Sequence, residues 1–119
     1  MFLEVASPSE LVKNFGFAHS AALVSKEPVE IGARVFIPLN TSEADERNAL
    51  VYETEVLNAP KAAGQAWATP GLPLYWDATA KVFTTLATDN ILCGFTLEPA
   101  LSADTVAPLF SFNSFAAVA

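Results

Sequence analysis

The chain has 119 residues, the length of one domain, and a domain of this size can bury a core without metals or disulfides. A single cysteine excludes an internal disulfide, and a net charge of −7 with only six Lys and Arg argues against a nucleic-acid partner. The first residues lack the features of a signal peptide and no run of about 18 apolar residues could span a bilayer, so we expect a soluble protein made in the cytoplasm, with no membrane partner.

Apolar residues are unusually abundant in this sequence. They make up 52% of the chain, whereas charged residues make up 16%, against about 25% in an average soluble domain. Two explanations stay open. The chain is either a well-packed β domain rich in alanine, or a domain with a large apolar surface that is buried in contacts between subunits.

Residues 1–28 are predicted to form an N-terminal arm or short helix, followed by a strand. Ser7 can cap a helix, Pro8 suits its first position, and Gly16 can end it after two turns. Since helices this short are marginal without packing, an extended arm is the alternative. Weak alternation over residues 17–24 then predicts a strand.

Residues 29–119 are predicted to form a β domain. Its first strand lies between a turn at Gly32 and Pro38, which places this strand end at an edge or exit of the sheet. Residues 40–48 form the most polar stretch; they lack the glycine of a calcium-binding loop and predict a solvated surface loop. Alternation over residues 50–56 predicts a half-buried strand with an acidic outer face.

Three strands are expected between residues 72 and 98. Leu72–Trp76 and residues 81–85 flank a turn and predict a hairpin, and a second turn leads to a third strand that starts at Ile91. The simplest arrangement is a meander of three consecutive antiparallel strands. The predicted core residues of this region are Leu72, Leu74, Trp76, Ile91, Cys93, Phe95 and Leu97.

The C-terminal part is predicted to form a last strand over residues 105–112, in which Pro108 indicates a sheet edge. Phe115 and the small residues after it continue the apolar character, so this tail is expected to dock against a surface. Taken with the other strands, these elements predict an all-β fold, a small antiparallel β-barrel or sandwich.

No catalytic or metal site can be assembled from the sequence. His19 is the only histidine, and Cys93 lies in an apolar strand that favours a buried, inert thiol. Asp77 follows an aromatic pair, and a turn aspartate that accepts hydrogen bonds from nearby backbone amides explains it. No phosphate-binding loop is present. We therefore predict a protein that is not an enzyme and holds no cofactor or metal.

A resemblance to a known family adds to this reading of the residues. The chain resembles the DUF2190 family of tailed-phage and prophage proteins through short segments that follow one another in the family's order: Pro60-Lys61-Ala62, a turn at Gly71, Tyr75-Trp76-Asp77, Val82-Phe83-Thr84-Thr85 and Gly94. The likeness covers about residues 29–112. An acidic region, residues 43–55, stands where the family usually has a glycine-rich segment.

The resemblance implies a β-barrel-like capsid decoration or cement protein on the exterior of the virion, made in the host cytoplasm. Such a protein would bind the major capsid protein and stabilise the contacts between its subunits. A tail- or fibre-associated binding module of the virion is the alternative.

The apolar excess and the three-fold positions of capsid lattices favour a homo-oligomer, which we expect to be a homotrimer. Its contacts with other subunits are predicted to involve apolar residues near the two ends of the chain. These residues are Phe2, Leu3, Phe110, Phe112 and Phe115.

Overall fold

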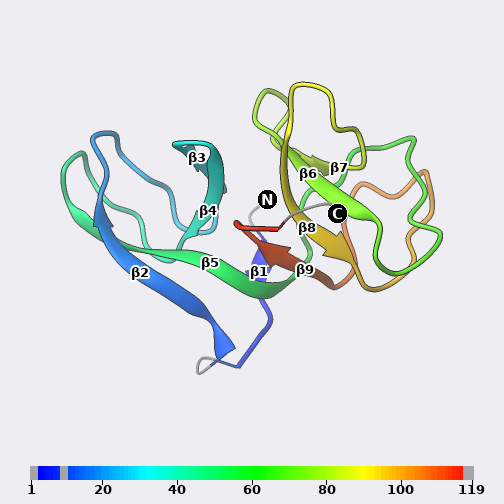
Figure 1. The fold of residues 1–119 in the computed structure, drawn as a ribbon, viewed down its shortest axis with the longest axis horizontal. Helices are drawn as coiled ribbons and strands as arrows, with labels where there is room; N and C mark the ends of the chain where they lie inside the picture. Colours follow the sequence, from blue (N-terminus) through cyan, green and yellow to red (C-terminus); the bar gives the residue numbers. More distant parts are fainter. Residues whose placement is uncertain (1–2, 9–10, 117–119) are drawn as a thin grey trace.

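The computed structural model describes residues 3–8 and 11–116 of the protein. These residues form nine strands in one curled antiparallel sheet, a half-barrel, and contain no α-helix (Figure 1), which confirms the predicted all-β fold. The strands are β1 (Glu4–Val5), β2 (Lys13–Ala18), β3 (Val29–Ile31), β4 (Arg34–Pro38), β5 (Arg47–Leu57), β6 (Pro73–Asp77), β7 (Val82–Thr84), β8 (Ile91–Thr96) and β9 (Phe110–Asn113).

β5 is the longest strand, with 11 residues, and the rest of the sheet is organised around it. One of its edges pairs with β2 and then β1, and its other edge pairs with β4 and then β9. From β9 the sheet continues through β8 and β6 to β7. The strand predicted from alternation is confirmed, with Leu50, Thr54 and Val56 buried, but Val51 is buried as well because apolar clusters cover both faces here.

The N-terminal segment is extended, so the structure shows the arm and not the helix. The Pro8 carbonyl accepts a hydrogen bond from the Leu11 N–H at 2.8 Å, and β2 begins two residues later. Residues 9–10 lie outside the described part of the chain. Pairing with β5 gives the backbone of the arm the hydrogen-bond partners that a two-turn helix would have supplied. The strand predicted over residues 17–24 lies earlier in the chain, at residues 13–18.

β3 and β4 form a hairpin around Gly32, where the turn was predicted but strand β3 was not. The φ of Gly32 is +64°, a left-handed conformation that favours glycine. Pro38 is the last residue of β4, where its missing N–H does not interrupt the ladder. The loop of residues 40–46 that follows is exposed except at Ser42.

The meander predicted for residues 72–98 is wrong in its strand order. β6 lies in the middle, paired with β7 on one side and with β8 on the other. The far side of β7 is occupied by residues 60–62, where the Phe83 N–H donates to the Pro60 carbonyl at 2.9 Å and the Ala62 N–H donates to the Phe83 carbonyl at 3.0 Å. β8 therefore pairs with the open edge of β6.

The predicted core of this region is correct in part. The pairing of β6 with β8 shifts between Leu74 and Tyr75, and this irregularity interrupts the two-residue alternation on which the prediction was based. Three of the predicted residues are buried: Leu74, Trp76 and Cys93. Three are half-buried: Leu72, Ile91 and Phe95. The prediction of Leu97 as a core residue is wrong. This residue comes after the end of β8, and its side chain is 40% exposed.

β9 is a central strand between β5 and β8, so the sheet edge predicted from Pro108 is wrong. Pro108 precedes the strand, which begins at Phe110, and it therefore takes no position in the ladder. Close approach of β8 and β9 depends on Gly94, because a Cβ at this residue would lie 2.2 Å from the Ser111 carbonyl oxygen.

Two apolar clusters cover opposite faces of β4 and β5. The main core contains a group of aromatic rings in which the centroid of Phe83 lies 4.8 Å from those of both Trp76 and Phe110. The second cluster is smaller and is built on Leu23, Phe36 and Leu50. It positions the surface described next.

Candidate interaction surface

Four aromatic side chains gather over the second cluster and form what we term the aromatic patch. They come from β2, β4, β5 and the segment after β9, and are Phe15, Phe36, Tyr52 and Phe115. The ring centroids of Phe15 and Phe36 are 5.3 Å apart, and those of Tyr52 and Phe115 are 5.8 Å apart, both in edge-to-face geometry. Such pairs stabilise a structure beyond the area they bury.

Strand alternation brings these side chains together. Val51 and Ile37 belong to the main core, so their neighbours Leu50 and Phe36 point to the opposite face of the sheet. Phe15 is directly opposite Leu50 in the β2–β5 pairing and shares that face. The patch therefore follows from the two-residue period of three adjacent strands.

The protein itself covers the patch only in part. Phe36 is buried, whereas Phe115 is 54% exposed and Phe15 is 38% exposed. Phe17, two residues further along β2 and on the same strand face, is 39% exposed. Exposed aromatic side chains grouped in this way are typical of binding surfaces.

Arg34 adds a positive charge to the patch and docks the C-terminal segment. Its Cζ lies 5.3 Å from the centroid of the Phe115 ring, and its Nη1 donates a hydrogen bond to the Ser114 carbonyl at 3.3 Å. The buried Ser114 hydroxyl donates in turn to the Val35 carbonyl. Ala116 is buried, so the chain is docked as far as the structure describes it.

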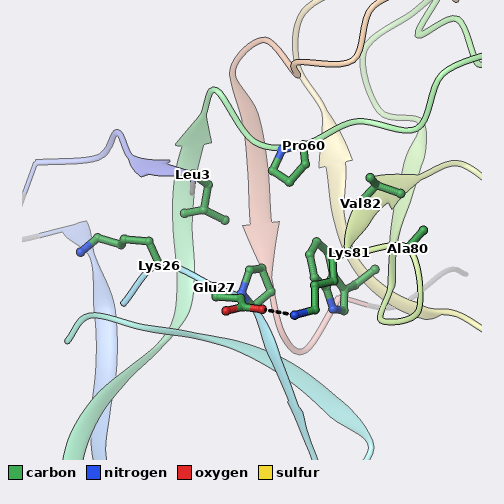
Figure 2. Close-up of a pocket in the computed structure, with 9 residues that line it drawn as sticks. Leu3, Lys26, Glu27, Pro60, Ala80, Lys81 and Val82 are labelled. Atoms are coloured by element: carbon green, nitrogen blue, oxygen red, sulfur yellow. Dashed lines mark hydrogen bonds and ion pairs between the residues drawn. The ribbon is translucent and has the colours of Figure 1, made fainter. Parts of the chain in front are cut away.

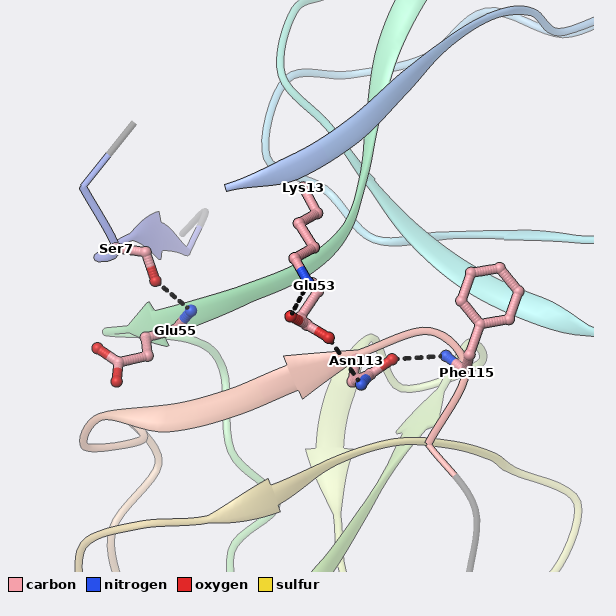
Figure 3. Close-up of polar contacts among 6 residues, drawn as sticks. All are labelled: Ser7, Lys13, Glu53, Glu55, Asn113 and Phe115. Carbon is pink, nitrogen blue, oxygen red and sulfur yellow. Dashed lines mark hydrogen bonds and ion pairs between the residues drawn. The ribbon is translucent and has the colours of Figure 1, made fainter. Parts of the chain in front are cut away.

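Polar contacts tie β2 and β9 to β5 beside the patch (Figure 3). The Lys13 ammonium lies 3.2 Å from the Glu53 carboxylate, which also accepts a hydrogen bond from Asn113 Nδ2 at 3.2 Å. Asn113 Oδ1 accepts a hydrogen bond from the Phe115 N–H at 2.9 Å. Glu53 thus links β2 to the strand that carries Phe115 and fixes two sides of the patch relative to each other.

The structure places the predicted interface residues in different environments. Leu3, Phe110 and Phe112 are buried in the main core of the same chain, so in this fold they offer no surface to a partner. Phe2 lies outside the described residues. Phe115 is exposed and belongs to the patch, and its role in an interface stays a prediction.

The sequence patterns do not single out three residues of this surface, Phe15, Phe17 and Tyr52. The helix signals at Ser7 and Pro8 masked the alternation of β2, in which the two phenylalanines flank a glycine. Alternation places Tyr52 in the correct strand but on the face predicted to be core. A strand assigned to residues 13–18 would have revealed the aromatic face.

The residues considered for chemistry have structural surroundings. Cys93 is buried in the core, and burial raises the pKa of its thiol above the ordinary value. The Asp77 carboxylate accepts hydrogen bonds from the Thr79 and Ala80 N–H groups at 3.0 Å each, as predicted for a turn aspartate. His19 is half-buried at the end of β2. In the part of the chain that the structure describes, no three His, Cys, Asp or Glu side chains group as a metal site.

A cleft of about 440 Å³ lies between the segment before β3 and the β6–β7 turn (Figure 2). Leu3, Pro60 and Trp76 contribute apolar surface to it. Glu27 and Lys81 form an ion pair of 2.7 Å across it. Its described lining includes no Ser, Cys, Thr or His.

Lys61, within the Pro60-Lys61-Ala62 motif, is buried and only 2% exposed. Its ammonium lies 5.8 Å from the centroid of the Trp67 ring and donates hydrogen bonds to four backbone carbonyl oxygens, those of Ala62, Gln65, Leu101 and Asp104. Burial lowers the pKa of Lys61, and the Asp104 carboxylate partly opposes that shift. The motif therefore joins two loops of the fold, a role that its sequence alone did not indicate.

An all-β domain with an exposed aromatic patch has the features of a protein that binds partners through its surface. Residues 7–109 match the phage cement protein family, and the chain belongs to this family. The match confirms the resemblance to phage capsid cement proteins and extends it toward the N-terminus, but it does not confirm the DUF2190 label. No curated protein and no solved structure matches the chain at a significant level. None of the described segments is a helix that could cross a membrane.

Proposed function

We propose that the protein decorates the outer surface of a phage head, where it binds the major capsid protein and stabilises the contacts between neighbouring capsid subunits. The observation that carries this proposal is the exposed aromatic patch on a member of the phage cement protein family. Family membership supports a structural role on the capsid. Aromatic residues and arginine are enriched at the centres of protein interfaces, and the patch combines both.

The residues around the patch are held in place, so binding a partner should cost little conformational entropy. Phe36 is buried beneath the exposed rings, and the Glu53–Asn113 contact holds β5 and β9 together at its side. Side chains that are already fixed lose less conformational entropy when a partner covers them. A rigid aromatic platform suits a protein that must bind many equivalent sites on a lattice.

We further infer that the protein acts as a homotrimer. Nine large apolar side chains of the described residues are exposed, including Leu101 at 73% and Leu86 at 62%. This exposure supports the explanation that part of the apolar excess is buried between subunits, in addition to a well-formed core. Three-fold positions on a capsid lattice would then combine three weak contacts into one stable attachment. The proposed function needs no enzymatic activity and no nucleic-acid partner.

Heads assembled without this protein provide the test. Purified protein is added to such heads, and cryo-electron microscopy is expected to show new density at regular positions on the outer surface, together with greater resistance of the heads to heat. Density on the tail or fibres would favour the alternative of a tail-associated module, and absence of binding would overturn the proposal. Analytical ultracentrifugation of the free protein tests the trimer separately.

A further inference from the structure

β2 lies along the outside of the molecule with one edge unpaired (Figure 1). Among the described residues it pairs only with β5, and all six of its residues are exposed. The other ends of the sheet are shorter or occupied: β3 has three residues, and β7 is flanked by residues 60–62. β2 is therefore the longest open edge that the structure describes.

An open edge presents unpaired backbone N–H and C=O groups that can pair with another extended chain. Natural sheets usually protect such an edge with proline, a bulge or several charged residues. β2 has the sequence Lys-Asn-Phe-Gly-Phe-Ala, with one charge at its beginning and no proline. Its one register irregularity lies between Lys13 and Asn14, so residues 14–18 form a regular and unprotected edge.

The two faces of this edge differ in chemistry. Phe15 and Phe17 share the face of the aromatic patch. On the opposite face, the Arg47 guanidinium packs over Gly16, where an added Cβ would lie 2.6 Å from Arg47 Nη2. Arg47 forms no ion pair with the described residues, whereas Lys13, at the start of the strand, is paired with Glu53. In a chain of net charge −7, one face of this edge is aromatic and the other carries positive charge.

We propose that β2 receives an extended segment of the major capsid protein as an added antiparallel or parallel strand. The segment would place apolar side chains beside Phe15 and Phe17 and a carboxylate within reach of Arg47. Main-chain hydrogen bonds along the edge give affinity, and the alternating side chains give specificity. This inference rests on the proposed function, because it names the surface with which the protein binds the capsid.

Charge complementarity favours a capsid segment over a second copy of this chain. Antiparallel pairing of two β2 strands about Gly16 would match Phe15 with Phe17 of the other copy. The same pairing would bring the two Arg47 guanidinium groups together on the other face, and like charges in such positions repel. A partner strand with a carboxylate at this place has no such penalty.

Hydrogen–deuterium exchange of the full chain, free and bound to heads assembled without it, tests the inference. We expect the β2 amides that point to the open edge, about every second residue of the strand, to exchange at least about tenfold more slowly on the head than in the free protein. Decorated heads with unchanged exchange in β2 would overturn the inference and leave the proposed function intact. Protection that is already present in the free protein and grows with its concentration would identify a second copy as the occupant and also overturn it. If the wild-type protein does not bind heads, the proposed function fails and this inference fails with it.

Charge variants of Arg47 test the carboxylate. Arg47→Glu is expected to weaken head binding by about tenfold or more at low salt, whereas Arg47→Lys retains the charge and is expected to bind within about threefold of wild type. Both substitutions are at an exposed position, so thermal unfolding should be nearly unchanged. Equal binding by the Glu variant and wild type would rule out the carboxylate contact.

Discussion

The Arg34 guanidinium lies over the exposed ring of Phe115, with Cζ 5.3 Å from the ring centroid. Phe115 follows β9, the last strand in the chain, whereas Arg34 begins β4, which is separated from β9 in the sheet by β5. Their contact places a positively charged side chain against an exposed aromatic ring on one surface. Because the Phe115 ring is 54% exposed, a substitution there can change binding without large loss of folding stability.

Phe115→Ala is expected to weaken binding to heads by about tenfold or more, because truncated aromatic side chains at interface centres cost about 2 kcal/mol. The free energy of unfolding should fall by only about 1 kcal/mol, since the ring is 54% exposed. Head occupancy and thermal unfolding measure the two effects. Thr88→Ala, at an exposed polar position outside the patch, is the control. A Phe115 variant that binds like this control would exclude the patch from the interface.

A larger deletion would not give this separation. Removing residues 112–119 would take away Phe112, which is fully buried, and break the pairing of β9 with β5 and β8. Loss of binding would then report unfolding. The substitution at Phe115 avoids this, because its backbone contact with Asn113 is retained.

Trp76→Ala is expected to lower the free energy of unfolding by about 3–5 kcal/mol, the usual cost of removing a large buried aromatic ring. The ring is 4% exposed and its centroid lies 4.8 Å from that of Phe83 in the main core. Urea denaturation measures the change. Leu86→Ala, at a position 62% exposed, is the control and should cost less than about 1 kcal/mol. A similar cost for both variants would contradict the assignment of Trp76 to the core.

Strand positions in this protein could be predicted from the sequence, because a two-residue period marks a half-buried strand wherever one face is covered. β5 and β6 were found in this way. The order of strands could not be predicted in the same way. It depends on which edges are open, and the edge of β7 is occupied by residues 60–62, which are far away in the sequence and carry no strand pattern of their own.

The candidate surface was harder to predict than the fold. Phe115 was identified from the apolar character of the tail, but Phe110 and Phe112 have the same character and are buried because β9 is a central strand. An apolar residue near a chain end can pack inward or face a partner, and composition does not distinguish these outcomes. The position of Phe15 beside Phe36 depends on pairing between β2, β5 and β4, which only the tertiary structure shows.

Gly94→Ala is expected to destabilise the protein by about 1–3 kcal/mol or more, because the new methyl group would lie 2.2 Å from the Ser111 carbonyl oxygen and force β8 and β9 apart. Gly16→Ala is the matched control. The three atoms nearest to its methyl group would all belong to the Arg47 guanidinium, the far end of a flexible side chain that can move away. Thermal unfolding of both variants measures the difference, and equal losses of stability would show that the β8–β9 approach is not tight.

Lys61→Met is expected to lower the free energy of unfolding by about 3 kcal/mol or more. The variant keeps most of the apolar stem but takes the ammonium donor from four part-buried carbonyl oxygens. The Leu101 carbonyl keeps the Asp104 N–H as a donor, and each of the other three that stays unsatisfied costs about 1–3 kcal/mol. Denaturant unfolding at neutral pH measures the loss. Lys81→Met is the control, because Lys81 is exposed and its single ion pair should contribute less than about 1 kcal/mol. A Lys61 variant as stable as the control would mean that water replaces the ammonium at no cost.

The pH dependence of stability gives an independent test of Lys61. Burial lowers the pKa of this residue in the folded protein below the ordinary value of 10.5, with Asp104 partly opposing the shift. In the pH range between the lowered pKa and 10.5, the unfolded chain therefore binds more protons at Lys61 than the folded chain does. Stability rises with pH wherever the unfolded state binds more protons, so the contribution of Lys61 should be lowest below its folded-state pKa and should grow as the pH approaches 10.5.

We expect the difference in unfolding free energy between wild type and Lys61→Met to widen over this range and to become constant above it. Subtracting the variant cancels the titration of the tyrosines and the other lysines, which both chains share. Urea denaturation at a series of pH values between neutrality and 10.5 measures the difference. If the difference instead narrows as the pH rises, the folded state stabilises the charged ammonium more than water does. The hydrogen bonds to the four carbonyl oxygens would then stabilise the ammonium by more than burial destabilises it.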